Sequence, residues 1–177
     1  MRRRAPLSRV SRAVPVMVTT GADTSKVGPW VKFAASVLML AAVNASGSAI
    51  QSSSSKVPSE STGGGFSIIE EANPLDTPLH VHKNEDEWWY VLEGEHVIKV
   101  GYDEFHVGPG EIVFGPRGVP HSQRRAVPRT GGFLEFFSPG GFEGFFRELA
   151  EAERSGSSMP EAYVRVSEKH GITWLNE

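Results

Sequence analysis

The chain has 177 residues, of which 39% are hydrophobic and 10% aromatic, which is sufficient for one globular domain with a buried core. It contains no cysteine, which excludes disulfides and thiolate metal sites, so any bound metal must be held by histidine and carboxylate ligands. The formal net charge of −3 argues against nucleic acid as a partner.

The N-terminal segment is basic. Residues 1–22 contain five arginines and no acidic residue, so the rest of the chain is more acidic than the net charge suggests. This composition fits an organelle transit peptide, although a disordered basic leader would look the same. We therefore expect a cytoplasmic protein, with organelle targeting by the arginine-rich N-terminus as the alternative.

An apolar segment follows from Phe33. It could be the apolar region of a signal peptide, but the long stretch before it favours a buried first strand over residues 37–43. Its apolar core of about 11 residues is too short to cross a bilayer, so no membrane span is expected. Residues 46–65 are rich in serine and glycine and predict a flexible linker. Residues 1–60 are thus expected to lie outside the main domain.

From Phe66 the chain alternates short apolar runs with turns rich in glycine, proline, asparagine and aspartate. Such regular spacing is typical of an antiparallel β-sandwich or barrel, which we place at residues 61–139. The predicted strands are FSIIEEA, LHVH, EWWYVLE, HVIKV, EFHV, EIVF, HSQRRAV and FLEFF.

The hydrophobic period changes after residue 140. The segment FEGFFRELAEAERS has apolar residues at the spacing of an amphipathic helix. A second helix is predicted over residues 160–169, because Pro160 suits the first helical turn and Gly171 ends the pattern. Residues 140–177 therefore predict a C-terminal helical appendage.

Four residues of two separate segments could bind a metal. His80 and His82 are two apart on a predicted strand, so both imidazoles point to one face. The turn KNED allows Glu87 to reach the same face from the next strand, and His121 begins a returning strand after a tight corner. Such a set suits Fe, Mn, Ni, Co, Cu or Zn in the divalent state, with one or two positions left for water or substrate.

These segments resemble the cupin superfamily, in particular small single-domain cupins of the quercetinase-like type. The stretch HVHKNEDEWWYVLEG is similar to the first cupin motif through His80, His82, Glu87 and Gly94. The stretch GEIVFGPRGVPH is similar to the second motif, and it ends on His121. The resemblance covers about residues 61–175 and implies an all-β, double-stranded β-helix (jelly-roll) barrel with a divalent metal held by the three histidines and the glutamate.

Three further residues are candidates for the substrate pocket. Trp89 shares the strand parity of Glu87 and should form a pocket wall. Gln123 and Arg125 point inward if the strand from His121 is regular, and an inward arginine would need a carboxylate or an anionic substrate. Alternatively, the strand bulges or ends and Arg125 is solvated.

The remaining polar residues are given structural roles. His96 and His106 have no spaced partner, and His170 precedes a glycine that ends a helix, where a cation is favourable. The acidic residues Glu85 and Asp86 are expected to form a solvated turn.

Several functions remain open, because one barrel hosts many chemistries. The first hypothesis is a dioxygenase-like oxidoreductase acting on a small aromatic or polyphenol-type metabolite, with Glu87 as the catalytic base, as the resemblance implies. The alternatives are a metal-dependent isomerase, cyclase or lyase, and a non-catalytic small-molecule-binding cupin. A homodimer is expected through the apolar outward face of WYVL and the early strand near Leu40.

Overall fold

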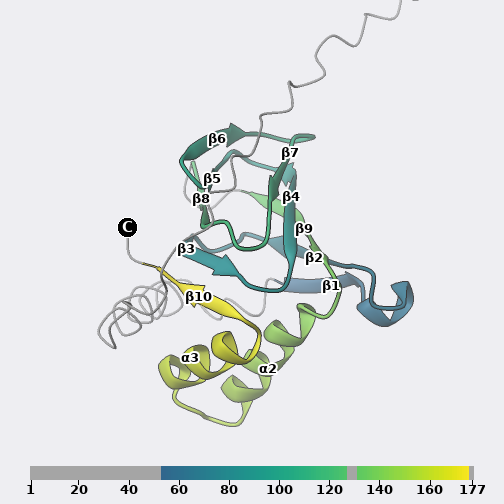
Figure 1. The fold of residues 1–177 in the computed structure, drawn as a ribbon, viewed down its shortest axis with the longest axis vertical. Coiled ribbons are helices and arrows are strands. Elements are labelled where there is room, and N and C mark those ends of the chain that lie inside the picture. The colour runs from purple at the N-terminus through teal and green to yellow at the C-terminus, as the bar shows by residue number, and fades with distance from the viewer. Residues whose placement is uncertain (1–52, 127–130, 176–177) are drawn as a thin grey trace, which may run out of the picture.

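The computed structural model describes residues 53–126 and 131–175 (Figure 1). The basic leader, the apolar segment with its expected first strand, and the beginning of the serine-rich segment lie outside the described residues. Within the part of the chain that the structure describes, no helix is long and apolar enough to span a membrane.

Two five-stranded antiparallel sheets form a jelly-roll barrel, which confirms the predicted fold class. One sheet has the order β1-β2-β9-β4-β7 and the other the order β10-β3-β8-β5-β6. The strand bounds are β1 Ser53–Val57, β2 Ser67–Ala72, β3 Thr77–His82, β4 Asp86–Glu93, β5 His96–Val100, β6 Asp103–Val107, β7 Ile112–Gly115, β8 His121–Arg125, β9 Gly132–Ser138 and β10 Ile172–Trp174.

Two strands lie where the sequence predicted none. The strand β1 falls inside the expected serine-rich linker, where it pairs with β2, followed by the short 3-10 helix η3 (Ser59–Thr62). The strand β10 falls inside the expected helical appendage and pairs with β3. Both are polar or very short segments whose pairing depends on a partner strand elsewhere in the chain, so local patterns do not reveal them.

The barrel core follows the alternation of side chains along its strands. Trp89 and Val91 of β4 and Phe133 and Phe137 of β9 point inward and are almost fully buried. The alternate residues of β4, Trp88 and Tyr90, point outward, as the strand parity predicted. The side chains that point inward from β4 and β9 therefore form one wall of the barrel interior.

The two predicted helices are present and pack against one end of the barrel (Figure 1). They span α2 (Glu143–Arg154) and α3 (Met159–Lys169). The apolar face of α2 packs with Phe142 against the barrel residues Ile69 and Phe137. This packing places aromatic side chains of the helical segment next to the barrel interior.

We predict that Glu143 stabilises the joint between α2 and the N-terminal part of the barrel. Its carboxylate accepts hydrogen bonds from the backbone N–H groups of Ser59, at 2.8 Å, and Gly141, at 3.0 Å. Burial alone would raise the pKa of Glu143, but hydrogen bonding, chiefly from Ser59, outweighs burial and lowers the pKa to about 2. The ionised form is therefore favoured in the folded state.

The variant Glu143→Gln should lose about 1 kcal/mol of stability at pH 6, a value reduced for the partial exposure of the side chain. Because the folded pKa is depressed, this contribution is complete above about pH 5 and disappears as the pH falls toward 2. Urea unfolding of both proteins at pH 6 and pH 3 measures the difference. The exposed Glu151→Gln is the control, and a difference independent of pH would contradict the role of the Glu143 charge.

Candidate metal centre

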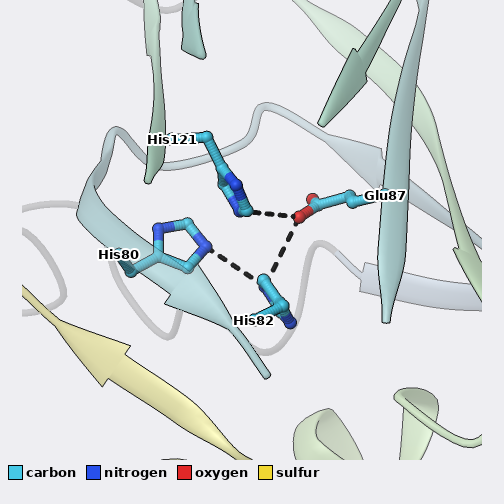
Figure 2. Close-up of side chains that lie close together, drawn as sticks. All are labelled: His80, His82, Glu87 and His121. Carbon is cyan, nitrogen blue, oxygen red and sulfur yellow. Dashed lines mark hydrogen bonds and ion pairs between the residues drawn. The ribbon is translucent and has the colours of Figure 1, made fainter. Parts of the chain in front are cut away.

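The strand β3 presents two imidazoles to the barrel interior. His80 and His82 are both buried and lie on the same face of the strand, as their spacing predicted. Their Nε2 atoms are 3.2 Å apart (Figure 2). The pair therefore offers two nitrogen atoms to one point inside the barrel.

The other two candidate ligands reach the same point from different strands. Glu87 comes from β4, and His121 is the first residue of β8. The Oε2 atom of Glu87 lies 3.4 Å from Nε2 of His82 and 3.2 Å from Nε2 of His121 (Figure 2). One ligand atom from each of the four buried side chains lies within 4.8 Å of all the others.

Contacts between the two motif segments hold this arrangement. The backbone N–H of Gly118, in the corner before His121, donates to the carbonyl oxygen of His82 at 2.8 Å. Gly118 has a φ of 76°, a conformation that glycine adopts without strain. Next to it, Arg117 donates from Nε, at 3.1 Å, and from Nη2, at 2.8 Å, to the carboxylate of Asp86. The corner is thereby fixed to both sides of the turn that joins β3 and β4.

Backbone carbonyl groups orient two of the imidazoles. The Nδ1–H of His80 donates to the carbonyl oxygen of Pro78 at 2.8 Å, and the Nδ1–H of His121 donates to that of Val119 at 2.9 Å. A carbonyl can only accept, so Nδ1 carries the proton and Nε2 keeps its lone pair in the neutral ring. Burial, and then the neighbouring His121 and His82, lower the pKa of His80 well below its usual value. Neutral imidazoles of this kind are metal ligands.

The four residues fit a divalent first-row metal. Oε2 of Glu87 and Nε2 of His121 are buried with no hydrogen-bond partner among the described residues. Two ligands about 2.1 Å from one ion at a tetrahedral angle lie roughly 3.4 Å apart, which agrees with the three shortest separations of 3.2, 3.2 and 3.4 Å. Three nitrogen donors and one carboxylate can bind divalent Fe, Mn, Ni, Co, Cu or Zn. This set of donors does not distinguish among the six metals.

The segment that carries the four candidate ligands matches a known protein family. Residues 69–127, which contain all four candidate ligands, match the family model described as "Cupin domain". The chain contains a cupin domain. This confirms the resemblance found from the two motifs.

Comparisons with individual proteins show distant relatives of the cupin domain. The chain is 29% identical over 94 residues to quercetin 2,3-dioxygenase of Bacillus subtilis (strain 168), covering 52% of this chain and 28% of that protein. The chain therefore spans less than a third of that relative's length. Among solved structures, the protein TT1209 from Thermus thermophilus is 27% identical with a TM-score of 0.41, covering 50% of this chain and 85% of that one. A protein described as a predicted oxalate decarboxylase from Thermotoga maritima is 21% identical with a TM-score of 0.43, covering 49% and 78%.

Two of the three predicted pocket residues line a cavity next to the candidate ligands. Trp89 is buried against His121, with the ring centroids 5.3 Å apart, and packs over Gly115, where an added Cβ would lie 2.8 Å from the indole. Gln123 donates from Nε2 to Thr77 Oγ1, at 3.1 Å, and to the carbonyl of Leu75. The tryptophan is one wall of the cavity, and the amide of Gln123 supplies a polar group.

Arg125 was placed in the pocket as one of two alternatives, and this placement is wrong. Among the residues that line the cavity in the described chain, Arg125 is absent. Its backbone N–H and its guanidinium lie 3.0 and 3.4 Å from Oδ1 of Asp76, and its side chain is only partly buried. The strand β8 keeps a regular register with β5 as far as Arg125, so the prediction failed at the partner of the side chain, because Asp76, just before β3, binds the arginine at the end of the strand.

The acidic residues before Glu87 are more than a solvated turn. Glu85 is buried, with Oε2 3.6 Å from Nδ1 of His82, on the opposite side of the imidazole from Glu87. Asp86 pairs with Arg117, and this pairing lowers the pKa of Asp86. The separation between Glu85 and His82 is too long for a hydrogen bond, so Glu85 lies beside the outer nitrogen of His82 without bonding to it.

Sequence reasoning missed two acidic residues of the cavity. Glu71 of β2 and Glu135 of β9 both line it, together with aromatic side chains of the helical segment. The available signal was strand parity, because Glu135 shares the parity of Phe133 and Phe137 and so points inward with them. A charged residue at such a position is unusual enough to mark a site.

The other histidines lie away from the four candidate ligands. His96 is buried against Phe133, and burial, more than any other effect, lowers its pKa. His106 is exposed and 3.2 Å from Glu104. His170 follows α3 and lies 3.0 Å from Glu148, as expected for a cation at a helix end.

Proposed function

We propose that this cupin domain is a metal-dependent oxidoreductase that acts on a small aromatic substrate bearing hydroxyl groups. The observation that carries the proposal is the convergence of His80, His82, Glu87 and His121 beside a cavity with aromatic walls. The distant similarity to a quercetin 2,3-dioxygenase supports the same chemistry.

The three imidazoles and Glu87 would hold a divalent first-row metal. When bound, such an ion supplies Lewis-acid polarisation of a substrate oxygen and, for redox-active metals, a route to dioxygen. The protein supplies the fixed orientation of the imidazoles, through the carbonyl groups of Pro78 and Val119.

Glu87 is suited to move a proton. Its Oε2 is buried and makes no hydrogen bond within the described residues, so when it does not hold the metal this oxygen can accept a proton from a substrate hydroxyl. The side chain comes from β4, whereas two of the histidines come from β3, so it approaches the site from a separate strand. We therefore assign Glu87 as the base that removes the hydroxyl proton.

The cavity walls suit a flat substrate that is held away from water. Trp89 lies on one side, and Trp174 of β10 lies near His80, with ring centroids 5.1 Å apart. Phe142 packs edge-on to His82 at 4.6 Å and closes the cavity from the helical segment. Aromatic faces bind aromatic rings in stacked or edge-on geometry.

Oxygen consumption tests this proposal. Protein loaded separately with Fe(II), Mn(II), Ni(II), Co(II) or Cu(II) should consume oxygen with at least one flavonol or related polyphenol. The same incubation without oxygen should leave the substrate unchanged. A metallated protein that consumes no oxygen across such a panel would count against the oxidoreductase.

A metal-dependent isomerase, cyclase or lyase is the second candidate. It is favoured by the number of carboxyl groups in the cavity, because Glu71 and Glu135 accompany Glu87 and all three can carry protons. Conversion of a substrate under anaerobic conditions would support this candidate over the first.

We also propose that two copies of the chain pair through the outward face of β4 and β7. Trp88 stacks on Phe114, with ring centroids 4.7 Å apart, while Leu92, Ile112 and Phe114 are each more than 40% exposed. The strand β7 is also the edge of its sheet, so its backbone is open to a partner.

The variant Phe114→Asp should convert the dimer to a monomer, because a carboxylate would be buried in the apolar interface. Light scattering on the purified proteins measures the change. Tyr102→Asp, at an exposed aromatic residue in the turn between β5 and β6, is the control and should remain dimeric. A wild-type protein that is monomeric at high concentration would contradict the pairing.

A further inference from the structure

The inner face of one sheet carries a diagonal row of three carboxyl groups. Glu87 is paired with Phe137 of β9, two residues from Glu135, and Glu71 is paired with Phe133, two residues from Glu135 on the other side. Diagonal neighbours of this kind have their Cα atoms about 7 Å apart. The row therefore leads from the candidate metal centre, through Glu135, to Glu71.

Glu71 and Glu135 have little to compensate them. The hydroxyl of Ser53 donates to Glu71 Oε1 at 2.9 Å. Among the described residues that line the cavity there is no lysine or arginine. Carboxyl groups buried without a cation are unfavourable to folding, and apolar side chains would fill the same positions without this cost. Their presence therefore indicates a ligand that they recognise.

The protonation of Glu71 agrees with a role in binding hydroxyl groups. Burial, with a smaller contribution from the charge of Glu87, raises the pKa of Glu71 to about 7 despite the hydrogen bond from Ser53. Near neutral pH this carboxyl group is present in both forms, so it can donate to or accept from a hydroxyl group.

Another polar atom of the cavity has unmet hydrogen-bonding capacity. The Oε1 of Gln123 is buried without a hydrogen-bond partner in the described part of the chain. It is an acceptor, and Gln123 lines the cavity beside aromatic rings. The lining thus matches an uncharged aromatic molecule that has several hydroxyl groups. It does not match a carboxylate or phosphate away from the metal centre.

We propose that Glu71 and Glu135 form a second polar subsite, which binds hydroxyl groups of an uncharged polyhydroxylated aromatic substrate and discriminates against substrates that carry a carboxylate. This subsite deepens the proposed function and rests on it for the aromatic class of substrate. Glu71 and Glu135 act as specificity-determining residues, while Glu87 remains the base at the candidate metal centre.

A matched pair of probes tests the subsite without turnover. The probes are 3,4-dihydroxybenzyl alcohol and 3,4-dihydroxybenzoate, which differ in charge and share the catechol ring. Their affinities for the Zn(II)-loaded protein are measured by calorimetry. We expect the alcohol to bind at least about tenfold more tightly than the benzoate, because a carboxylate would lose its hydration beside buried carboxyl groups that no lysine or arginine of the described cavity lining neutralises.

Variants connect this preference to the two glutamates. Glu71→Gln and Glu135→Gln should each reduce the preference, and the double variant should bring the two affinities within about threefold. Glu70→Gln changes the neighbouring residue on β2, which pairs with Lys56 outside the cavity at 3.1 Å, and should leave the preference unchanged. Circular dichroism checks that each variant is folded. If the variant of the more deeply buried Glu135 does not fold, Glu71→Gln alone tests the subsite.

The possible outcomes separate this inference from the proposed function. A preference that is unchanged in Glu71→Gln and in the double variant would overturn the subsite, and so would a wild-type protein that binds neither probe. If the preference depends on the two glutamates but no metal supports oxygen consumption, the subsite is supported and the oxidoreductase fails. If oxygen is consumed and the benzoate binds as well as the alcohol, the oxidoreductase is supported and the subsite fails.

Discussion

Alanine in place of His80, His82 or His121 is expected to remove most of the metal that the purified protein carries. Each change removes one of four buried donor groups that converge within 4.8 Å. The loss of a direct ligand should exceed the roughly 10 to 100-fold decrease in affinity that follows changes around the ligands. Elemental analysis gives the metal content per chain, and circular dichroism establishes that each variant is folded.

Two other histidines serve as controls for this experiment. His106→Ala changes an exposed side chain and should leave the metal content unchanged. His96→Ala removes a buried ring, so it should lower the melting temperature but not the metal content. Equal metal loss in these controls would place the site elsewhere. Full retention of metal in His121→Ala would separate the second motif segment from the first.

Glu87→Ala should give a different result, with substantial metal retained and turnover lost. Three imidazoles still form a competent site for a divalent first-row metal. Removal of a general base typically decreases the rate by about 10² to 10⁴-fold, and Glu87 is the buried carboxylate nearest to the histidine nitrogens. Metal content and oxygen uptake, measured on the same preparation, separate the two effects.

Glu87→Gln tests the proton transfer more strictly, because it preserves the shape of the side chain and removes the basic oxygen. It should be as inactive as the alanine variant. Glu93→Ala, at the exposed end of the same strand, should behave as the wild type. Wild-type turnover in Glu87→Gln would assign the proton transfer to another group, and complete loss of metal in Glu87→Ala would make Glu87 an obligatory ligand.

Much of the site could be predicted because its geometry is local. A spacing of two residues on a strand places His80 and His82 on one face whatever the rest of the fold. The parity of β4 likewise placed Trp89 inside the barrel, beside Glu87. Only the position of His121 required knowledge of how distant segments meet, and for that residue the prediction relied on the second motif.

The features that were missed depend on contacts between distant segments. The placement of Arg125 failed because Asp76, which is distant in sequence, binds the arginine at the end of β8. The strand β1 is polar, and it is recognisable only through its pairing with β2. Glu71 and Glu135 were overlooked although their strands were predicted, because the polar residues were not tested against the inward face of each strand.

The pairing of β10 with β3 has a consequence for the biogenesis of the protein. Ile172 and Trp174 lie opposite His82 and His80, so the strand that carries two candidate ligands has its outer neighbour in a much later part of the chain. During synthesis on the ribosome, β3 emerges long before β10 and until then remains an open edge. The outer side of the strand that carries His80 and His82 can therefore be covered only after translation has passed Trp174, so this wall of the barrel is completed late in synthesis.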